Sequence, residues 1–195
     1  MLVPLLNGLD HLQLLRERYP AARTVAGSIQ VAAHRTEPGS VRHEGTLAEV
    51  TLAPGAEDLA AALSGTGLTV AEHPDECRLL WAKLAFLAPL ALLTTATGGP
   101  LGPAREQRAE QLRAVVDEVA AVARADGADP DPVAVLQQLN SLPAQMRSSM
   151  QRDVEAGQPP ELDAIGGAVL RAAARHGVDV PVTRQLVEEI RARPS

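Results

Sequence analysis

The chain has 195 residues, of which 46% are hydrophobic and 22% charged, and its formal net charge is −6. This length and composition predict one long or two short globular domains and exclude a chain that is disordered by composition. The acidic balance and an aromatic content of only 2% argue against a nucleic-acid-binding protein, which would normally carry a basic surface. The single cysteine, Cys77, excludes an internal disulfide bond and fits a reducing compartment.

Neither a metal site nor a membrane span is predicted. One cysteine and five scattered histidines do not form a zinc set, and His34, His43 and His176 have no partner that can be identified from the sequence. Residues 1–10 lack the basic region of a signal peptide. Residues 84–93 are apolar but are broken by Pro89, and a spanning helix needs about 20 residues. We therefore expect a cytoplasmic protein that has no membrane partner.

Before about residue 75, the pattern predicts short strands alternating with helices. Strands are expected at residues 1–6, 24–35, 41–53 (as two short strands) and 68–73. Helices are expected at residues 9–18 and 56–64, the second ending at Gly65 and Gly67. A turn is expected at Pro38-Gly39.

After Pro74 the pattern predicts helices alone. They are expected at residues 75–97 (bent or interrupted at Pro89), 104–126, 132–142, 149–156, 160–175 and 181–193. Asp131 precedes a proline at the first position of the third of these helices. Ser148 and Gln151 have the spacing of a capping box.

The front of the chain does not contain a recognisable phosphate-binding loop. Neither G-x-G-x-x-G nor G-x-x-x-x-G-K-[ST] occurs, and the glycines at 65–67 and 98–102 follow predicted helices. Residues 1–6 form a continuous apolar run, which is typical of a strand buried on both faces of a parallel sheet. Such a strand needs parallel neighbours, and none precedes it, so we expect the front half to be a truncated part of a larger domain.

Four motifs resemble those of a known protein family. They are PLLNG at 4–8, TEPGSVRH at 36–43, LWAK at 80–83 and SSMQRDVEAGQPPELDAIGGAV at 148–169. In wording, order and spacing they resemble ketopantoate reductases (2-dehydropantoate 2-reductases), without most of that family's front domain. The resemblance implies an α+β fold in which residues 1–74 are a truncated remnant of an NADP-binding Rossmann-like domain. Residues 75–195 would form an all-helical domain similar to the C-terminal domain of 6-phosphogluconate dehydrogenase.

The resemblance also implies an activity, namely NADPH-dependent reduction of 2-dehydropantoate to pantoate on the route to coenzyme A. Lys83 matches the family's catalytic general acid, and Glu161 matches the acidic residue that binds and orients the substrate. Ser149 matches a serine that holds the substrate, and Asn7 matches an asparagine that contacts both cofactor and substrate. Without the glycine-rich loop we expect the chain alone to be inactive or weak, and to need a separate N-terminal Rossmann half. A homodimer is a further expectation.

Some family positions differ in this chain. Asparagines that bind substrate hydroxyls in the family are replaced, by ungapped spacing, by Leu87, Ala91 and Met146. The substrate is therefore either 2-dehydropantoate or a more apolar 2-oxo acid, or the activity has been lost. In the last case the chain would be a non-catalytic helical module for dimerisation or small-acid binding.

Each candidate residue also has a simpler interpretation. Lys83 could extend its stem along an apolar helix and keep its ammonium in water. Glu161 could be favoured by a helix dipole, and Ser149 could be an N-cap or lie next to one. Asn7 could serve only the Asn-Gly turn.

Overall fold

The computed structural model describes residues 1–193, except the side chains of residues 34, 35 and 44. The expectation for His34 and the last two residues of the predicted helical domain therefore lie outside the described residues. The chain divides into two compact units, Met1–Leu80 and Trp81–Ser195. The division falls within helix α3, Glu76–Thr97.

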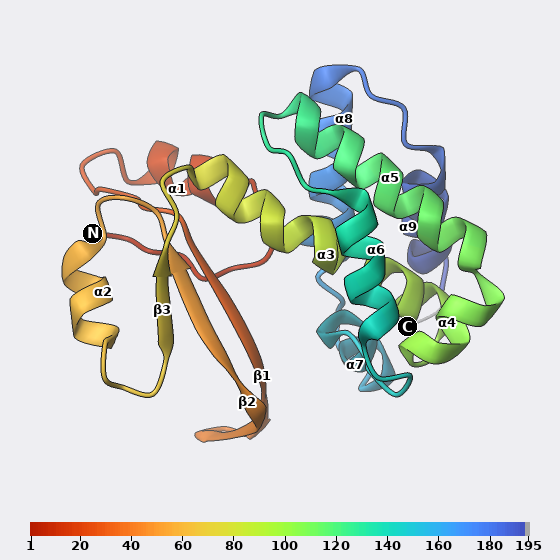
Figure 1. The fold of residues 1–195 in the computed structure, drawn as a ribbon, viewed down its shortest axis with the longest axis horizontal. Helices are drawn as coiled ribbons and strands as arrows, with labels where there is room; N and C mark the ends of the chain where they lie inside the picture. Colours follow the sequence, from red (N-terminus) through yellow and green to blue (C-terminus); the bar gives the residue numbers. More distant parts are fainter. Residues whose placement is uncertain (194–195) are drawn as a thin grey trace. The chain divides into compact units, whose positions relative to one another are not determined.

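The first unit is built on a three-stranded sheet in the order β1-β2-β3 (Figure 1). Strands β1, Gly27–Glu37, and β2, Ser40–Leu52, form an antiparallel hairpin, and β3, Thr69–Glu72, pairs with β2 in parallel. The hairpin closes where Glu37 pairs with Ser40, and Gly39 adopts a φ of 86° in the turn. This confirms the predicted turn, since positive φ in a two-residue hairpin loop favours glycine.

Two strand predictions were wrong in detail. Residues 41–53 form most of one long strand and not two, because a bulge around Gly45, with a φ of 73°, absorbs the change of register without ending the pairing. Residues 1–6 make only one bridge, between Leu2 and Thr24. Pro4 has no N–H for a ladder, and Leu6 is 57% exposed, so this segment is not a strand buried on both faces.

The helices of the first unit are short. Helix α1 is His11–Arg18, and α2, Glu57–Leu63, makes the crossover between the parallel strands β2 and β3. The core between the helices and the sheet is aliphatic. It comprises Leu12, Val25, Ala26, Val50, Leu52, Ala53, Ala56, Ala60, Leu79 and Leu80.

The described part of the second unit contains helices and no strand, as predicted (Figure 1). The elements after α3 are α4 (Leu101–Gln107), α5 (Ala109–Ala125), α6 (Pro132–Ser141), α7 (Ser149–Glu155), the π-helical turn η1 (Asp163–Gly167), α8 (Ala168–His176) and α9 (Pro181–Arg191). Helix α5 packs against α4, α6, α8 and α9 and is therefore central. Its stripe of Leu112, Val115, Val116, Val119 and Val122 is buried as expected.

Two helices differ from their predicted course. The helix predicted at 104–126 is broken at Arg108, whose backbone has φ −130° and ψ 33°. The Arg108 guanidinium is held by the Ala96 carbonyl at 3.0 Å and by Glu189 at 2.6 Å, so tertiary contacts set the break. The helix predicted at 160–175 begins as the π-turn η1, and Gly177 closes α8 in the left-handed conformation.

Helix α3 confirms the helix predicted at residues 75–97 and is not interrupted at Pro89, since it runs through this residue for 22 residues. Pro89 has no N–H, so one i→i−4 hydrogen bond is missing inside the helix. By length and composition alone it could cross a membrane, but 78% of its apolar window is buried within the protein. Such burial is typical of a core helix. The cytoplasmic location stays a prediction.

At two helix ends of the second unit, polar side chains from elsewhere in the chain form hydrogen bonds with backbone groups that have no partner within the helix. The Glu118 carboxylate on α5 accepts hydrogen bonds from the N–H groups of Val182 (2.9 Å) and Thr183 (2.7 Å) and from the Thr183 hydroxyl (2.6 Å). At the end of α3, Arg193 donates to the carbonyls of Thr95 and Ala96. These contacts fix the orientation of α9 without a cap from its own sequence.

Candidate active site

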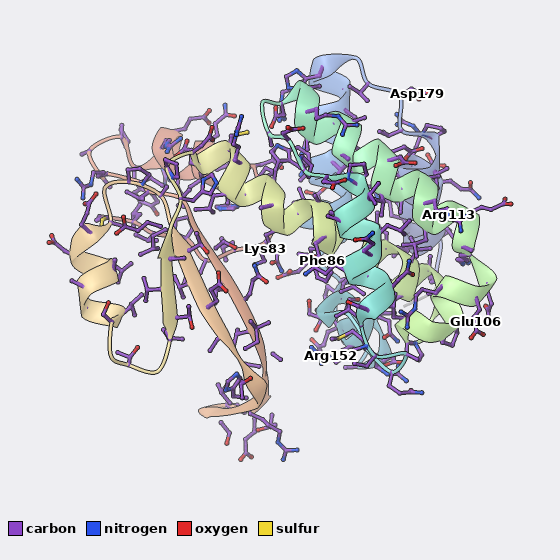
Figure 2. The ribbon with its side chains drawn as sticks, in the orientation of Figure 1. Lys83, Phe86, Glu106, Arg113, Arg152 and Asp179 are labelled. Atoms are coloured by element: carbon purple, nitrogen blue, oxygen red, sulfur yellow. The ribbon has the colours of Figure 1, made fainter. Side chains whose placement is uncertain are left out.

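Lys83 lies on α3 and is partly buried among apolar residues. Leu84 and Ala85 next to it are buried, and Phe86, on the next turn, is half-buried. Figure 2 labels Lys83 and Phe86 on this helix. Burial lowers the pKa of Lys83, because an apolar environment disfavours the ammonium form, and the negative charge of Glu161 acts in the opposite direction. Burial and the charge of Glu161 therefore act in opposite directions on the pKa of this amine.

Glu161 lies just before η1, after Pro159 and Pro160. Its carbonyl accepts the N–H of Ile165 at 3.1 Å, which fixes the backbone at the entrance to the π-turn. Its side chain is exposed, yet its charge raises the pKa of Lys83. The second unit therefore brings together two of the four predicted site residues from segments far apart in the sequence.

Ser149 is exposed at the first position of α7, and its neighbour Ser148 is the N-cap. The Ser148 hydroxyl accepts the N–H of Gln151 at 3.1 Å and shares a 2.8 Å hydrogen bond with Thr94 of α3. Ser149 is therefore the neighbour of the cap and not the cap itself. The buried pair leaves the Ser149 side chain at the surface while holding its helix against α3.

The predicted capping box is only half formed. Ser148 caps the helix, but the Gln151 side chain does not return to the backbone of Ser148. The amide nitrogen and oxygen of Gln151 are buried and have no hydrogen-bond partner. The reason is that Gln151 points into the interior, where the residue is 1% exposed, and a capping glutamine must lie along the helix surface.

Asn7 belongs to the first unit, whereas Lys83, Ser149 and Glu161 belong to the second. It is partly buried and precedes Gly8, which has a φ of 87°. The Asn-Gly pair therefore makes the expected change of chain direction, since this backbone conformation favours glycine. The expected role of Asn7 at a cofactor and substrate site stays a prediction.

Asp153 was not predicted as a site residue. Burial raises its pKa, the charge of Glu161 raises it further, and Arg152 acts in the opposite direction. Asp153 lies four residues after Ser149 on α7, so the two side chains share one face of the helix. This spacing within SSMQRD was the signal available in the sequence.

The described residues of the first unit offer no cradle for a dinucleotide pyrophosphate. The strand-to-helix connection before α2 carries Glu57, whose carboxylate accepts the N–H of Gly55 at 2.7 Å. The connection before α3 carries Asp75, whose carboxylate accepts the N–H of Arg78 at 3.0 Å. A carboxylate at each helix start occupies the donors and repels the negative charge that such loops normally bind.

In the described part of the chain, no group of three or more His, Cys, Asp and Glu side chains is arranged to hold a metal ion. His176 does have a carboxylate partner, contrary to the sequence-based expectation, because Asp126 lies 2.6 Å from its Nε2 atom. The two residues are fifty positions apart, so only the packing of α8 on α5 brings them together.

Two family models match most of the chain. The model described as "Ketopantoate reductase PanE/ApbA C terminal" matches residues 77–194, and "Ketopantoate reductase PanE/ApbA" matches residues 1–57. A curated relative, 2-dehydropantoate 2-reductase from Mycobacterium tuberculosis, is 32% identical over 93% of this chain. The aligned region spans 63% of that relative.

Solved structures have the same fold. A 2-dehydropantoate 2-reductase from Methylococcus capsulatus superposes with a TM-score of 0.87 at 25% identity, over 99% of this chain and 67% of the other. A D-mandelate dehydrogenase in complex with NADH gives a TM-score of 0.86 at 25% identity, over 97% of this chain and 69% of the other. The likeness extends over both units of the chain.

Proposed function

Because the chain belongs to the ketopantoate reductase family, we propose that it provides the proton-donating and substrate-binding part of an oxidoreductase acting on 2-oxo acids. The observation that carries this proposal is the environment of Lys83. Its ammonium is partly buried on an apolar helix, and its pKa is lowered by burial and held up by the charge of Glu161. An amine in this setting is suited to give and recover a proton.

The composition of the chain supports a special role for this residue. Of the 18 lysine and arginine residues, only Lys83 is a lysine. Arginine keeps its proton at all ordinary pH values, whereas a lysine can release its proton when its pKa is lowered. A position that must donate a proton therefore accepts lysine and excludes arginine, and this chain uses its one lysine at that position.

The chemistry follows from the charges. Reduction of a 2-oxo acid places negative charge on the former carbonyl oxygen, whichever donor supplies the hydride. In the proposed arrangement the Lys83 ammonium stabilises that oxygen and then transfers a proton to it. Glu161 holds the ammonium in place and binds the substrate, and the Ser149 hydroxyl is available at the surface of α7 for a further hydrogen bond.

The proposed cofactor is NADPH, by family resemblance, but these residues do not fit its pyrophosphate. Carboxylates stand at both strand-to-helix connections of the first unit. We therefore assign pyrophosphate binding to a separate N-terminal Rossmann half, with residues 1–74 completing that domain. Asn7 would be the contribution of this chain to the cofactor and substrate site.

The substrate is proposed to be a 2-oxo acid with an apolar side chain, in preference to 2-dehydropantoate. Phe86 and Leu87 lie three and four residues after Lys83, on the same side of α3, and both are half-buried. Neither side chain can hydrogen-bond a substrate hydroxyl. A solved relative of the same fold is a D-mandelate dehydrogenase, whose name indicates an aryl hydroxy acid.

The first test is calorimetric titration of the chain with NADPH, 2-dehydropantoate and phenylglyoxylate, each alone and in pairs. Binding of a 2-oxo acid that Lys83→Met abolishes, and that Arg113→Met at an exposed position on α5 does not, would support the proposal. Turnover would then be measured after fusion to the N-terminal third of the Mycobacterium tuberculosis relative. A fusion that binds NADPH but oxidises it with neither acid would contradict a catalytic role and favour the alternative of a binding or dimerisation module.

A further inference from the structure

A buried hydrogen bond links α3, the helix that carries Lys83, to the end of α5. The indole Nε1 of Trp81 donates to Oδ2 of Asp126 at 2.7 Å, and Trp81 is only 1% exposed. An indole has one polar group, which can only donate, so a buried tryptophan depends on an acceptor at this position. Asp126 is that acceptor, and it comes from the end of α5.

Asp126 is itself held by several contacts. Its N–H donates to the Val122 carbonyl at 3.0 Å, which anchors its backbone to α5. Its other carboxylate oxygen lies 2.6 Å from Nε2 of His176 and 3.6 Å from the guanidinium of Arg175. Burial would raise the pKa of Asp126, but the hydrogen bonds from Trp81 and His176 and the nearby positive charges together lower it. The acceptor is therefore a carboxylate at neutral pH.

The link bears on Lys83 through the geometry of α3. Trp81 precedes Lys83 by two residues, which corresponds to a rotation of about 200° around a helix axis. The two side chains therefore leave opposite sides of the helix. The hydrogen bond from Trp81 to Asp126 fixes the direction of the indole and therefore the rotation of this turn of α3 about the helix axis. The direction in which the Lys83 side chain leaves the helix is fixed with it.

We propose that Asp126 is a positioning residue for Lys83, acting through the Trp81 indole and the first turns of α3. Neither Asp126 nor Trp81 is assigned to the substrate site. Their role is to hold the amine where it is partly desolvated and within the field of Glu161. This inference extends the proposed function, but the position of Lys83 can be measured without any turnover.

The test uses two unique residues of the full chain. Lys83 is the one lysine, so reductive methylation with ¹³C-formaldehyde labels its amine and the chain terminus, and Lys83→Arg identifies the lysine signal. Trp81 is the one tryptophan, so its indole N–H gives a single ¹H–¹⁵N resonance that reports the bond to Asp126. We expect Asp126→Ala to shift this resonance and to raise the Lys83 titration midpoint by roughly 0.5 pH unit or more, because a loosened turn lets the ammonium reach water.

Three comparisons separate positioning from general loosening. Trp81→Phe removes the donor together with part of the ring and should shift the Lys83 midpoint as Asp126→Ala does, and the double variant should add little further. Asp126→Asn keeps an acceptor oxygen and should keep most of the wild-type midpoint. Glu118→Ala, which disturbs α9, should lose stability without moving the midpoint.

An unchanged Lys83 midpoint in both Trp81→Phe and Asp126→Ala would overturn the inference, as would an equal shift in Glu118→Ala. If the expected shift occurs but the fused enzyme reduces no 2-oxo acid, the proposed function fails and the positioning contact stands. If the fused enzyme is active and neither variant moves the Lys83 midpoint, the proposed function stands and the positioning inference fails.

Discussion

Thr94 and Ser148 join two helices through hydroxyl groups that are both buried, with 2.8 Å between their oxygens. Thr94 lies in the last turn of the apolar helix α3, where its hydroxyl also donates to the Leu90 carbonyl at 2.7 Å. Ser148 starts α7, the helix that carries Ser149 and Asp153. One pair of small polar side chains thus connects the helix of Lys83 to the other polar residues of the candidate site.

The two adjacent serines should differ sharply in their effect on stability. Ser148→Ala removes a helix cap and leaves the Thr94 hydroxyl with one partner fewer, so we expect a loss of about 1–3 kcal/mol in the free energy of unfolding. Ser149→Ala, at an exposed side chain, should change it by less than about 0.5 kcal/mol. Urea unfolding measures both. Equal effects would contradict the assignment of Ser148 as the cap.

Glu118 should stabilise the second unit through the start of α9. Glu118→Ala leaves the N–H groups of Val182 and Thr183 and one hydroxyl without their acceptor, and we expect a loss of about 2–3 kcal/mol. Asp117→Ala, at the exposed neighbour, is the matched control and should be nearly neutral. Hydrogen exchange at Val182 and Thr183 should accelerate in the first variant alone.

Two adjacent glycines in η1 should respond differently to alanine. A Cβ on Gly166 would lie 2.6 Å from Val187 Cγ2 and 3.2 Å from Leu92 Cδ2, in a region without free space. We expect Gly166→Ala to destabilise by about 1–3 kcal/mol. Val187→Ala in the same chain should recover part of this loss.

Gly167→Ala is the control for that experiment. Its Cβ would meet the Asp163 carboxylate at 2.6 Å, and that side chain is 76% exposed and can rotate away. The cost should therefore be smaller than for Gly166. Thermal unfolding compares the two, and an equal loss would show that the π-turn, and not the contact with Val187, makes glycine necessary.

Because of Lys83, we expect the free energy of unfolding to depend on pH in the alkaline range. Its pKa is lowered in the folded chain from an ordinary value of 10.5, so between the two values the unfolded chain binds more protons. Stability relative to Lys83→Met should therefore rise as pH increases through the lowered pKa and level off above 10.5. Chemical unfolding at several pH values tests this. A relative stability that falls over that window would mean that Glu161 outweighs the effect of burial.

Much of the architecture could be predicted from local patterns. The helix of residues 132–141 was indicated by Asp131 and Pro132, and the structure confirms that the Asp131 carboxylate accepts the N–H of Val133 at 2.8 Å. The family resemblance drawn from four motifs is confirmed by matches over residues 1–57 and 77–194. The roles of Lys83, Glu161, Ser149 and Asn7 stay predictions.

Local pattern failed where distant contacts decide. Arg108, at the break, contacts Ala96 and Glu189, and Gly166 of the π-turn packs against Val187. Gln151 points into the interior. Sequence periodicity does not reveal such distant packing. The same holds for the site. The family resemblance identified Lys83 and Glu161, and the lowered pKa of the amine follows from its burial in the folded chain.

Residue order therefore accounts for the turns, the caps, the apolar stripes and the family motifs, because each depends on neighbours within a few positions. The course of α3 through Pro89, the contact of Asp126 with both Trp81 and His176, and the coupling of Glu161 to Lys83 came from packing alone. They join positions up to 78 residues apart, the separation of Glu161 from Lys83 (161 minus 83). Folding must bring such residues together before their hydrogen bonds and charges can act.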